Sequence, residues 1–98
     1  MRMKNVMLGT AALLAAIVPL GACQAERSVA AAESALEEAR AAHADYLAPY
    51  EWRSAELYLD RARHDLLASE ERGAMRYAAK AAVLAGEAKA KAAKKVSR

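Results

Sequence analysis

The single cysteine of this chain, Cys23, is the residue whose side chain is best suited to covalent modification. It follows a short basic start, an apolar segment at residues 6–18 and the small residues Gly21 and Ala22, which together have the three-part layout of a secretory signal peptide. The apolar segment is shorter than the ~20 residues of a membrane-spanning helix. Because a lone cysteine cannot form an intramolecular disulfide, its thiol is free for another covalent use.

The order Leu20-Gly21-Ala22-Cys23 resembles the lipobox of bacterial lipoproteins. The resemblance implies that diacylglycerol is joined to the Cys23 thiol, that residues 1–22 are removed as a signal peptide, and that the new amine is acylated. Two or more acyl chains anchor a protein stably, so the membrane is the first expected partner of residues 23–98. The absence of Asp after the cysteine, where Gln24 stands, implies the bacterial outer membrane, with the domain in the periplasm.

The remaining reactive side chains do not form a catalytic or metal-binding pattern. His43 and His64 have no second histidine or cysteine at ligand spacing. The serines lack a nucleophile signature, and no glycine-rich phosphate loop is present. We therefore expect no enzymatic activity, no metal and no cofactor. Nucleic acid is an unsuitable partner for an exported, lipid-tethered chain.

Four aromatic residues around Pro49 form the first candidate site: Tyr46, Tyr50, Trp52 and Tyr58. They have two interpretations. The rings could fill the corner where one helix turns into the next, or they could form a partner-binding surface, since Tyr and Trp are typical anchors of protein interfaces.

A basic C-terminal segment is the second candidate site. Most acidic residues precede Arg72, whereas Glu87 is the only acid after it, and five basic residues follow Ala88: Lys89, Lys91, Lys94, Lys95 and Arg98. They could complement the helix dipole and neighbouring acidic helices. Alternatively, they could contact an anionic envelope polymer, lipopolysaccharide or peptidoglycan. Because Val96 is the one bulky apolar residue beyond Leu84, we expect residues 89–98 to add little to the core.

The elements that must carry these residues are helices. Alanine, the best helix former, is the commonest residue of the mature chain, and no stretch alternates with period two. We expect an all-α fold, a helical hairpin or three-helix bundle, with helices at about 26–48, 50–67 and 70–94. Pro49 ends the first helix and suits the first position of the second. A turn with Ser69 as helix cap is favoured over one continuous helix.

Apolar residues at spacings of three and four predict the buried face of each helix. In the first helix they are Val29, Ala32, Leu36, Ala39, His43 and Tyr46. In the second they are Trp52, Ala55, Leu59, Ala62 and Leu66. In the third they are Met75, Ala79, Ala82, Gly86, Ala90 and Ala93.

The segment from Pro49 to Arg63, with its P-Y-E-x-x-S-A-E-x-Y-L order, and the later stretch from Arg76 to Ala81 resemble an uncharacterised bacterial lipoprotein family. The resemblance implies location and helical fold but no activity. The expected function is that of a lipid-anchored outer-membrane protein with a structural or adaptor role in the envelope. The alternative is binding of an anionic polymer through the basic C-terminal helix. The sequence leaves the oligomeric state open.

Overall fold

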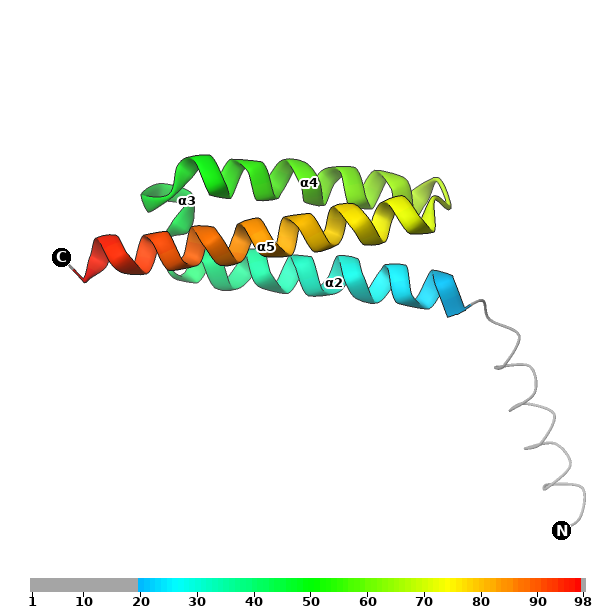
Figure 1. Cartoon of the computed structure of the whole chain (residues 1–98), viewed down its shortest axis with the longest axis horizontal. Coiled ribbons are helices and arrows are strands. Elements are labelled where there is room, and N and C mark those ends of the chain that lie inside the picture. Colours follow the sequence, from blue (N-terminus) through cyan, green and yellow to red (C-terminus); the bar gives the residue numbers. More distant parts are fainter. Residues whose placement is uncertain (1–19, 98) are drawn as a thin grey trace, which may run out of the picture.

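The computed structural model describes residues 20–97, with side chains from Cys23 onward. Within this range four helices follow one another: α2 (Leu20–Ala41), α3 (Ala44–Leu47), α4 (Pro49–Leu67) and α5 (Glu71–Val96). The described part of the chain contains no strand, so the all-α prediction is confirmed. Figure 1 shows the three long helices side by side and the short α3 at one end. The expected signal peptide lies outside the described residues except for its last three.

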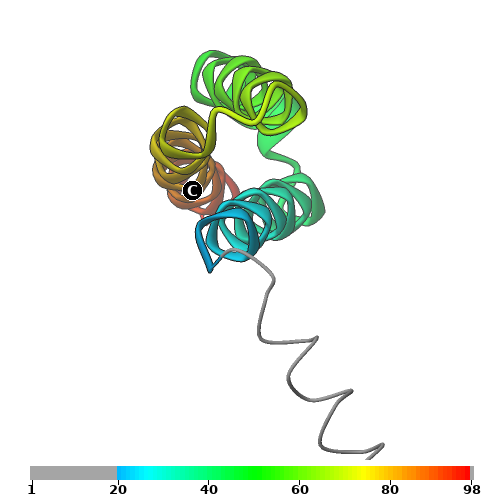
Figure 2. The same cartoon turned by 90° about the vertical axis from the view of Figure 1, so that its right-hand side faces the viewer.

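Helix α5 is the central element of the bundle. It packs along both α2 and α4, whereas α2 and α4 contact each other much less. Seen nearly along the helix axes in Figure 2, α2 and α4 lie on either side of α5, and few of their residues approach each other. The chain therefore has two kinds of helix contact, a close one along α5 and a looser one between α2 and α4.

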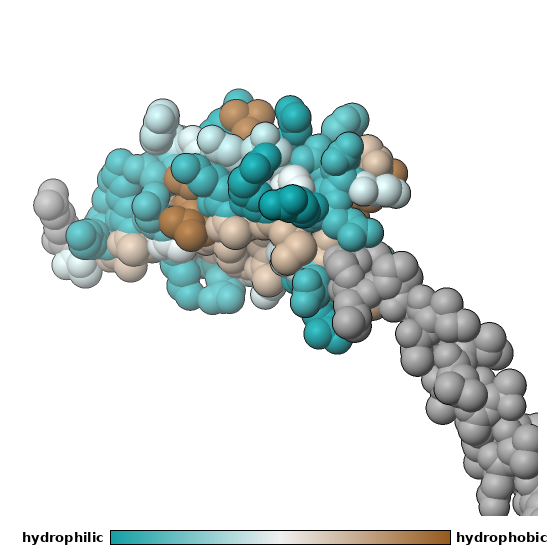
Figure 3. Space-filling model, turned by 45° about the vertical axis from the view of Figure 1, so that its right-hand side comes forward, coloured by the Kyte–Doolittle hydropathy of each residue, from teal (hydrophilic) through white to brown (hydrophobic). Residues whose placement is uncertain are grey.

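The core is thin because small side chains make most of it. Alanines occupy every core position with no exposed surface, and the largest buried side chains, Val29, Leu36, Trp52 and Leu59, each keep a few per cent of theirs. Side chains this small let helix backbones approach closely, but each buries little apolar area. On the outside, Figure 3 shows hydrophilic residues over the upper part of one face, a band of weakly hydrophobic residues below them and a few strongly hydrophobic residues.

The connection between α2 and α4 differs from the prediction of one helix over 26–48. Helix α2 ends at Ala41, and His43 has a φ of 61°, in the left-handed region. A left-handed residue after the last turn commonly ends a helix, and histidine is among the residues enriched there. The chain then forms the single turn α3 before Pro49, which begins α4 as predicted. No glycine or proline at residues 42–43 signals the break.

The turn between α4 and α5 is present, but Ser69 has a different role from the predicted one. Ser69 has a φ of 60°. Its N–H donates to the Leu66 carbonyl at 3.1 Å, and the Glu70 N–H donates to the Asp65 carbonyl at 2.8 Å. These two bonds form the Schellman motif that ends a helix. Ser69 thus ends α4, while Glu70 precedes α5 and makes no side-chain cap.

The predicted buried faces are correct for α4 as far as Ala62 and for α2 as far as Ala39. At the end of α4, Leu66 is only half-buried, and its neighbour Asp65 is buried instead. His43 and Tyr46 are exposed, because the break in α2 takes them off the helix face. The prediction for α5 is wrong: each buried residue comes one position before the predicted one, or two positions before it in one case. The buried residues are Ala74, Ala78, Ala81, Ala85, Ala88 and Ala92. In an alanine-rich helix several faces are equally small and apolar, so alanine periodicity alone does not select one.

The two ends of the bundle hold different features. The start of α2, which carries Cys23, lies at the same end as the α4–α5 turn, whereas α3 and the end of α5 lie at the opposite end (Figure 1). We call these the cysteine end and the distal end.

Candidate functional site

Cys23 lies at the beginning of α2, where its side chain is half-buried and its thiol is free. The backbone of Leu20, Gly21 and Ala22 forms the first turn of the same helix. Ala25, only two residues after Cys23, is already fully buried. The packed bundle therefore begins almost at the cysteine, with no intervening loop.

The four aromatic residues predicted as one cluster do not come together. Tyr46 on α3 and Tyr50 on α4 are 82% and 77% exposed, so their rings do not fill the corner. Trp52 is 7% exposed and belongs to the core. Tyr58 lies further along α4 and pairs with a residue of α5 instead. The corner interpretation is wrong for the exposed tyrosines and correct only for Trp52.

Trp52 lies at the seam between α2 and α4. The Arg40 guanidinium, from α2, lies over its ring at 5.4 Å from the centroid. A cavity of about 450 Å³ follows this seam, lined by charged residues of both helices above Leu36, Trp52 and Leu59. Arg63 crosses the seam and donates to Glu33 Oε2 from Nη2 at 2.7 Å and from Nε at 3.2 Å. Apolar groups line the bottom of this seam, while paired charges bridge its top.

Three of the C-terminal lysines contact other helices of the bundle. Lys89 Nζ donates to Glu38 Oε1 of α2 at 2.8 Å, and Lys91 Nζ donates to Glu51 Oε2 of α4 at 3.0 Å. Lys95 Nζ donates to the Leu47 carbonyl of α3. This arrangement agrees with the interpretation in which the lysines complement the acidic helices. Lys94 makes no side-chain ion pair within the described residues, and Arg98 lies outside them.

The same contacts correct the expectation that residues 89–98 add little to the core. Ala92 is fully buried and belongs to the core cluster. The last turns of α5 are therefore part of the bundle, held by Ala92 and by lysine contacts to α2, α3 and α4.

These ion pairs change the acidity of two carboxyl groups. The hydrogen bond from Lys89, and then its charge, lower the pKa of Glu38 below its ordinary value of 4.5. The hydrogen bond from Lys91 is the main cause of the lowered pKa of Glu51, and a backbone hydrogen bond adds to it. Both groups lie on the surface, so solvent and salt screen these interactions.

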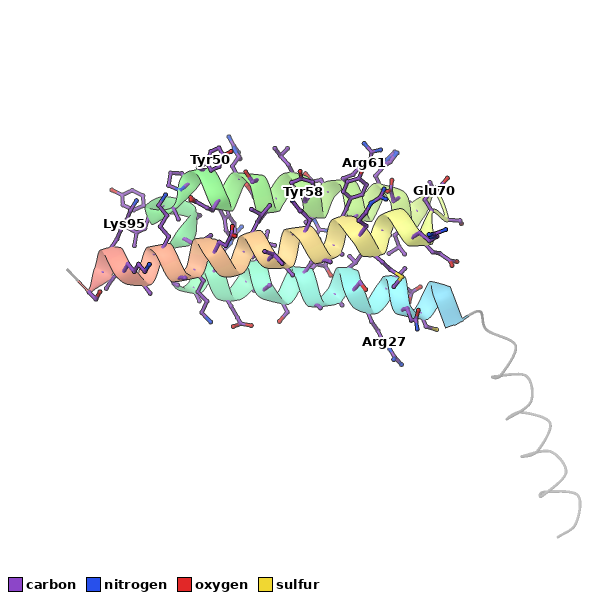
Figure 4. The ribbon with its side chains drawn as sticks, in the orientation of Figure 1. Arg27, Tyr50, Tyr58, Arg61, Glu70 and Lys95 are labelled. Atoms are coloured by element: carbon purple, nitrogen blue, oxygen red, sulfur yellow. The ribbon has the colours of Figure 1, made fainter. Side chains whose placement is uncertain are left out.

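A third group of residues, missed as a site by sequence reasoning, lies on the outer face of α4 and α5. The rings of Tyr58 and Tyr77 stack with centroids 6.0 Å apart and an interplanar angle of 25°. Arg61 and Arg76 lie over the Tyr77 ring at 5.2 and 5.4 Å, and the Lys80 ammonium lies over the Tyr58 ring at 5.7 Å. We call these five residues the tyrosine platform. Figure 4 shows Tyr58 and Arg61 away from Tyr50 and Lys95 at the distal end.

The register of the α4–α5 hairpin explains the platform. Arg61 and Tyr77 are equidistant from Ser69 along the chain, and so are Tyr58 and Lys80. In an antiparallel hairpin, residues at equal distances from the turn lie opposite each other. Counting outward from Ser69 would therefore have identified these contacts from the sequence.

The histidines lie apart from these sites. His43 is exposed at the α2–α3 break, and His64 is exposed in the last turn of α4. Within residues 20–97, no three His, Cys, Asp or Glu side chains are grouped as metal ligands would be. None of the helices in that range has both the length and the apolar character needed to cross a bilayer.

Residues 27–98 match the model of a protein family described as a domain of unknown function, DUF4398. The chain belongs to this family. The match confirms the expected membership of an uncharacterised family and covers every helix of the bundle except the first turns of α2. Comparison with curated proteins and with solved structures found no match. For this DUF4398 chain, function must therefore be argued from its own residues.

Proposed function

We propose that this chain is an outer-membrane lipoprotein whose helical bundle acts as a structural or adaptor component in the periplasm. The proposal depends above all on the position of Cys23, two residues before the first buried residue of the bundle, Ala25. Acylation of Cys23, with palmitate among the expected chains, would hold the bundle directly at the bilayer, because no loop separates the anchor from the core. Multiple acyl chains would make that attachment stable.

This attachment gives the bundle a defined direction. The α4–α5 turn lies at the cysteine end (Figure 1), with Leu67 beside it and 88% exposed. A leucine there could enter the headgroup region of the membrane. The 26 residues of α5 span about 39 Å at 1.5 Å per residue. The distal end would thus stand roughly 40 Å from the bilayer surface.

Tyr46 and Tyr50 are the proposed adaptor surface at that distal end. Both rings are mostly exposed although they flank a helix junction. Tyrosine buries a large, rigid area at low cost in side-chain entropy and is enriched among residues that dominate interface energies. An envelope protein that docks at the distal end would cover them.

Polymer binding through the C-terminal lysines is the competing proposal. Lys89, Lys91 and Lys95 already contact groups of the bundle, so a polymer would have to compete with Glu38 and Glu51 for two of them. Such binding would weaken with ionic strength, whereas docking on tyrosine rings would depend little on salt. These pairings favour the adaptor proposal.

Lipidation is tested with Cys23→Ser in cells supplied with labelled fatty acid. The wild-type chain is expected to incorporate the label, and the variant is expected to accumulate as an unlabelled precursor. A variant that still labels and matures would contradict the lipoprotein proposal.

The adaptor surface is tested by placing a photo-crosslinking amino acid at position 50, and as a control at Val83, which is 60% exposed on α5. We expect a discrete crosslinked species from position 50 that survives high salt and is lost with Tyr46→Ala. Equal crosslinking from both positions would contradict a defined surface at the distal end.

A further inference from the structure

The basic residues of α5 differ in the groups that they contact. Near the distal end, Lys89 and Lys91 pair with carboxylates of α2 and α4. At the tyrosine platform, neither Arg76 nor Lys80 pairs with a carboxylate of the described residues, and both lie over tyrosine rings. Arg61, the third cation there, contacts Asp65 at 3.4 Å through Nε. Lys94 and Lys95, nearer the C-terminus, also lack a carboxylate partner among the described residues, but of the cations of α5 only those of the platform lie over aromatic rings.

The platform combines three kinds of group that a ligand could use. Its guanidinium groups can bind a phosphate or carboxylate through paired N–H donors. Its half-buried tyrosine rings offer apolar faces and hydroxyl groups. A shallow hollow of about 770 Å³ lies beside them, lined by Ser54, Leu57, Tyr58, Asp60, Arg61 and Tyr77. That volume is within the range of small-molecule sites.

We propose that the tyrosine platform binds a sugar ring that carries an anionic group, phosphate or carboxylate. Arg76 and Lys80 attract the anion, with Arg61 beside them. The hollow beside the rings is lined in part by the Ser54 hydroxyl and the Asp60 carboxylate, which suit sugar hydroxyl groups. Asp60 also disfavours a uniform polyanion, although Arg63 lies 3.6 Å from it and offsets part of its charge. The platform therefore fits an anionic sugar better than a bare anion.

This inference does not depend on acylation of Cys23, although the proposed envelope location guides the choice of probes. Lipopolysaccharide supplies phosphorylated sugars, and peptidoglycan supplies sugars and peptides with carboxylates. The probes are deacylated lipopolysaccharide oligosaccharide, soluble muropeptides and inorganic phosphate. Binding to the mature protein, purified from membranes in non-ionic detergent, is measured by calorimetry and by NMR shifts of the Arg76 and Lys80 amides.

The test variant is Arg76→Gln/Lys80→Gln, and the matched control is Arg53→Gln/Lys94→Gln, which removes the same charge elsewhere. Arg53 is 79% exposed and reaches Glu56 only at 4.0 Å. We expect the platform variant to raise the Kd about tenfold or more, since charged hydrogen bonds contribute that much, and the control to change it by less than about twofold. Tyr77→Leu, which keeps Arg76 and Lys80, should also weaken binding. Helicity by circular dichroism verifies that each variant folds.

Binding of either carbohydrate probe with this pattern supports the proposal, and the probe that binds distinguishes lipopolysaccharide from peptidoglycan as the source of the sugar. Equal loss in the two double variants would show non-specific charge attraction and overturn it. The proposal would also be overturned if neither carbohydrate bound, or if inorganic phosphate bound with the same Kd as the oligosaccharide.

Discussion

The two kinds of helix contact in this bundle are made by side chains of very different size. Along α5, helices meet through alanines that have no exposed surface, from Ala74 to Ala92. Between α2 and α4, the contact depends on the large side chains of Leu36 and Trp52, and the Arg63–Glu33 ion pair bridges above them. The first seam is close and uniform, whereas the second is open and filled by a few large groups.

The difference shows how a chain poor in large apolar residues can still form a bundle. Alanine seams need no large side chain, because the backbones themselves approach, but they leave no room for added volume. The α2–α4 seam accepts volume, but it concentrates the stabilising burial in few residues. Substitutions should therefore act in opposite ways at the two seams: removing atoms should be most costly at the open seam, and adding atoms at the close one.

Trp52→Ala should have the largest effect, because it removes the largest buried side chain from the open seam. Loss of a buried tryptophan costs about 3–5 kcal/mol, and small domains have only about 5 kcal/mol or somewhat more to lose. We expect thermal unfolding by circular dichroism to lose its cooperative transition. Tyr50→Ala, which removes an exposed ring two residues away, is the control and should leave the transition unchanged. Similar destabilisation by both would contradict the assignment of Trp52 alone to the core.

Ala78→Leu tests the close seam by adding atoms. Overpacking a tight core costs about 1–3 kcal/mol, and Ala78 has no exposed surface. The neighbouring Ala79 is exposed, so Ala79→Leu should change the free energy of unfolding by less than about 0.5 kcal/mol. Urea denaturation of the two variants measures the difference. Greater destabilisation by Ala79→Leu would mean that Ala79 lies on the buried face of α5, as expected from the sequence alone.

Glycine substitutions in α5 sharpen the same comparison on a smaller scale. A Cβ added at Gly86 meets nothing within 4 Å, so Gly86→Ala should stabilise the helix by about 1 kcal/mol. A Cβ at Gly73 would collide with the Asp65 carboxylate of α4, which is buried and paired with Arg61. Gly73→Ala should therefore not show that gain, and its free energy of unfolding, measured in urea, should be lower than that of the wild type. An equal gain at both positions would show that α4 and α5 do not approach closely near their turn.

The fold could be predicted from the sequence where side chains differ strongly, and not where they are alike. Pro49 marks the start of α4, and the spacing from Trp52 to Ala62 gives the correct buried face. The face of α5 could not be chosen, because alanines lie all round that helix. The break at His43 was missed because the left-handed position is occupied by a residue other than glycine.

The candidate sites were predictable only in part, because they depend on contacts between helices. The basic residues at the end of α5 were visible in the sequence, but their pairing with Glu38 and Glu51 depends on how α2 and α4 lie beside α5. The aromatic residues near Pro49 are close in sequence, yet the helix sends Trp52 inward and Tyr50 outward. The tyrosine platform follows from the turn at Ser69, once residues are counted outward from it.

The smallest expected change in stability comes from Lys89, which links the end of α5 to α2. Its dependence on pH distinguishes this change from the others. Because the pKa of Glu38 is lowered in the folded state, the ion pair stabilises the fold above about pH 4.5 and loses its effect as the pH falls through the folded pKa. Lys89→Gln should therefore lower the Tm at neutral pH and converge with the wild type in acid. Lys94→Gln removes the same charge at a lysine that pairs with no carboxylate of residues 23–97, so its Tm should follow the wild type at every pH. Added salt should reduce the difference for Lys89→Gln, because an exposed pair is screened. If the lower Tm of Lys89→Gln persisted unchanged in acid, the lysine would contribute by packing its aliphatic stem and not by its charge. It would then act as the alanines do along this seam.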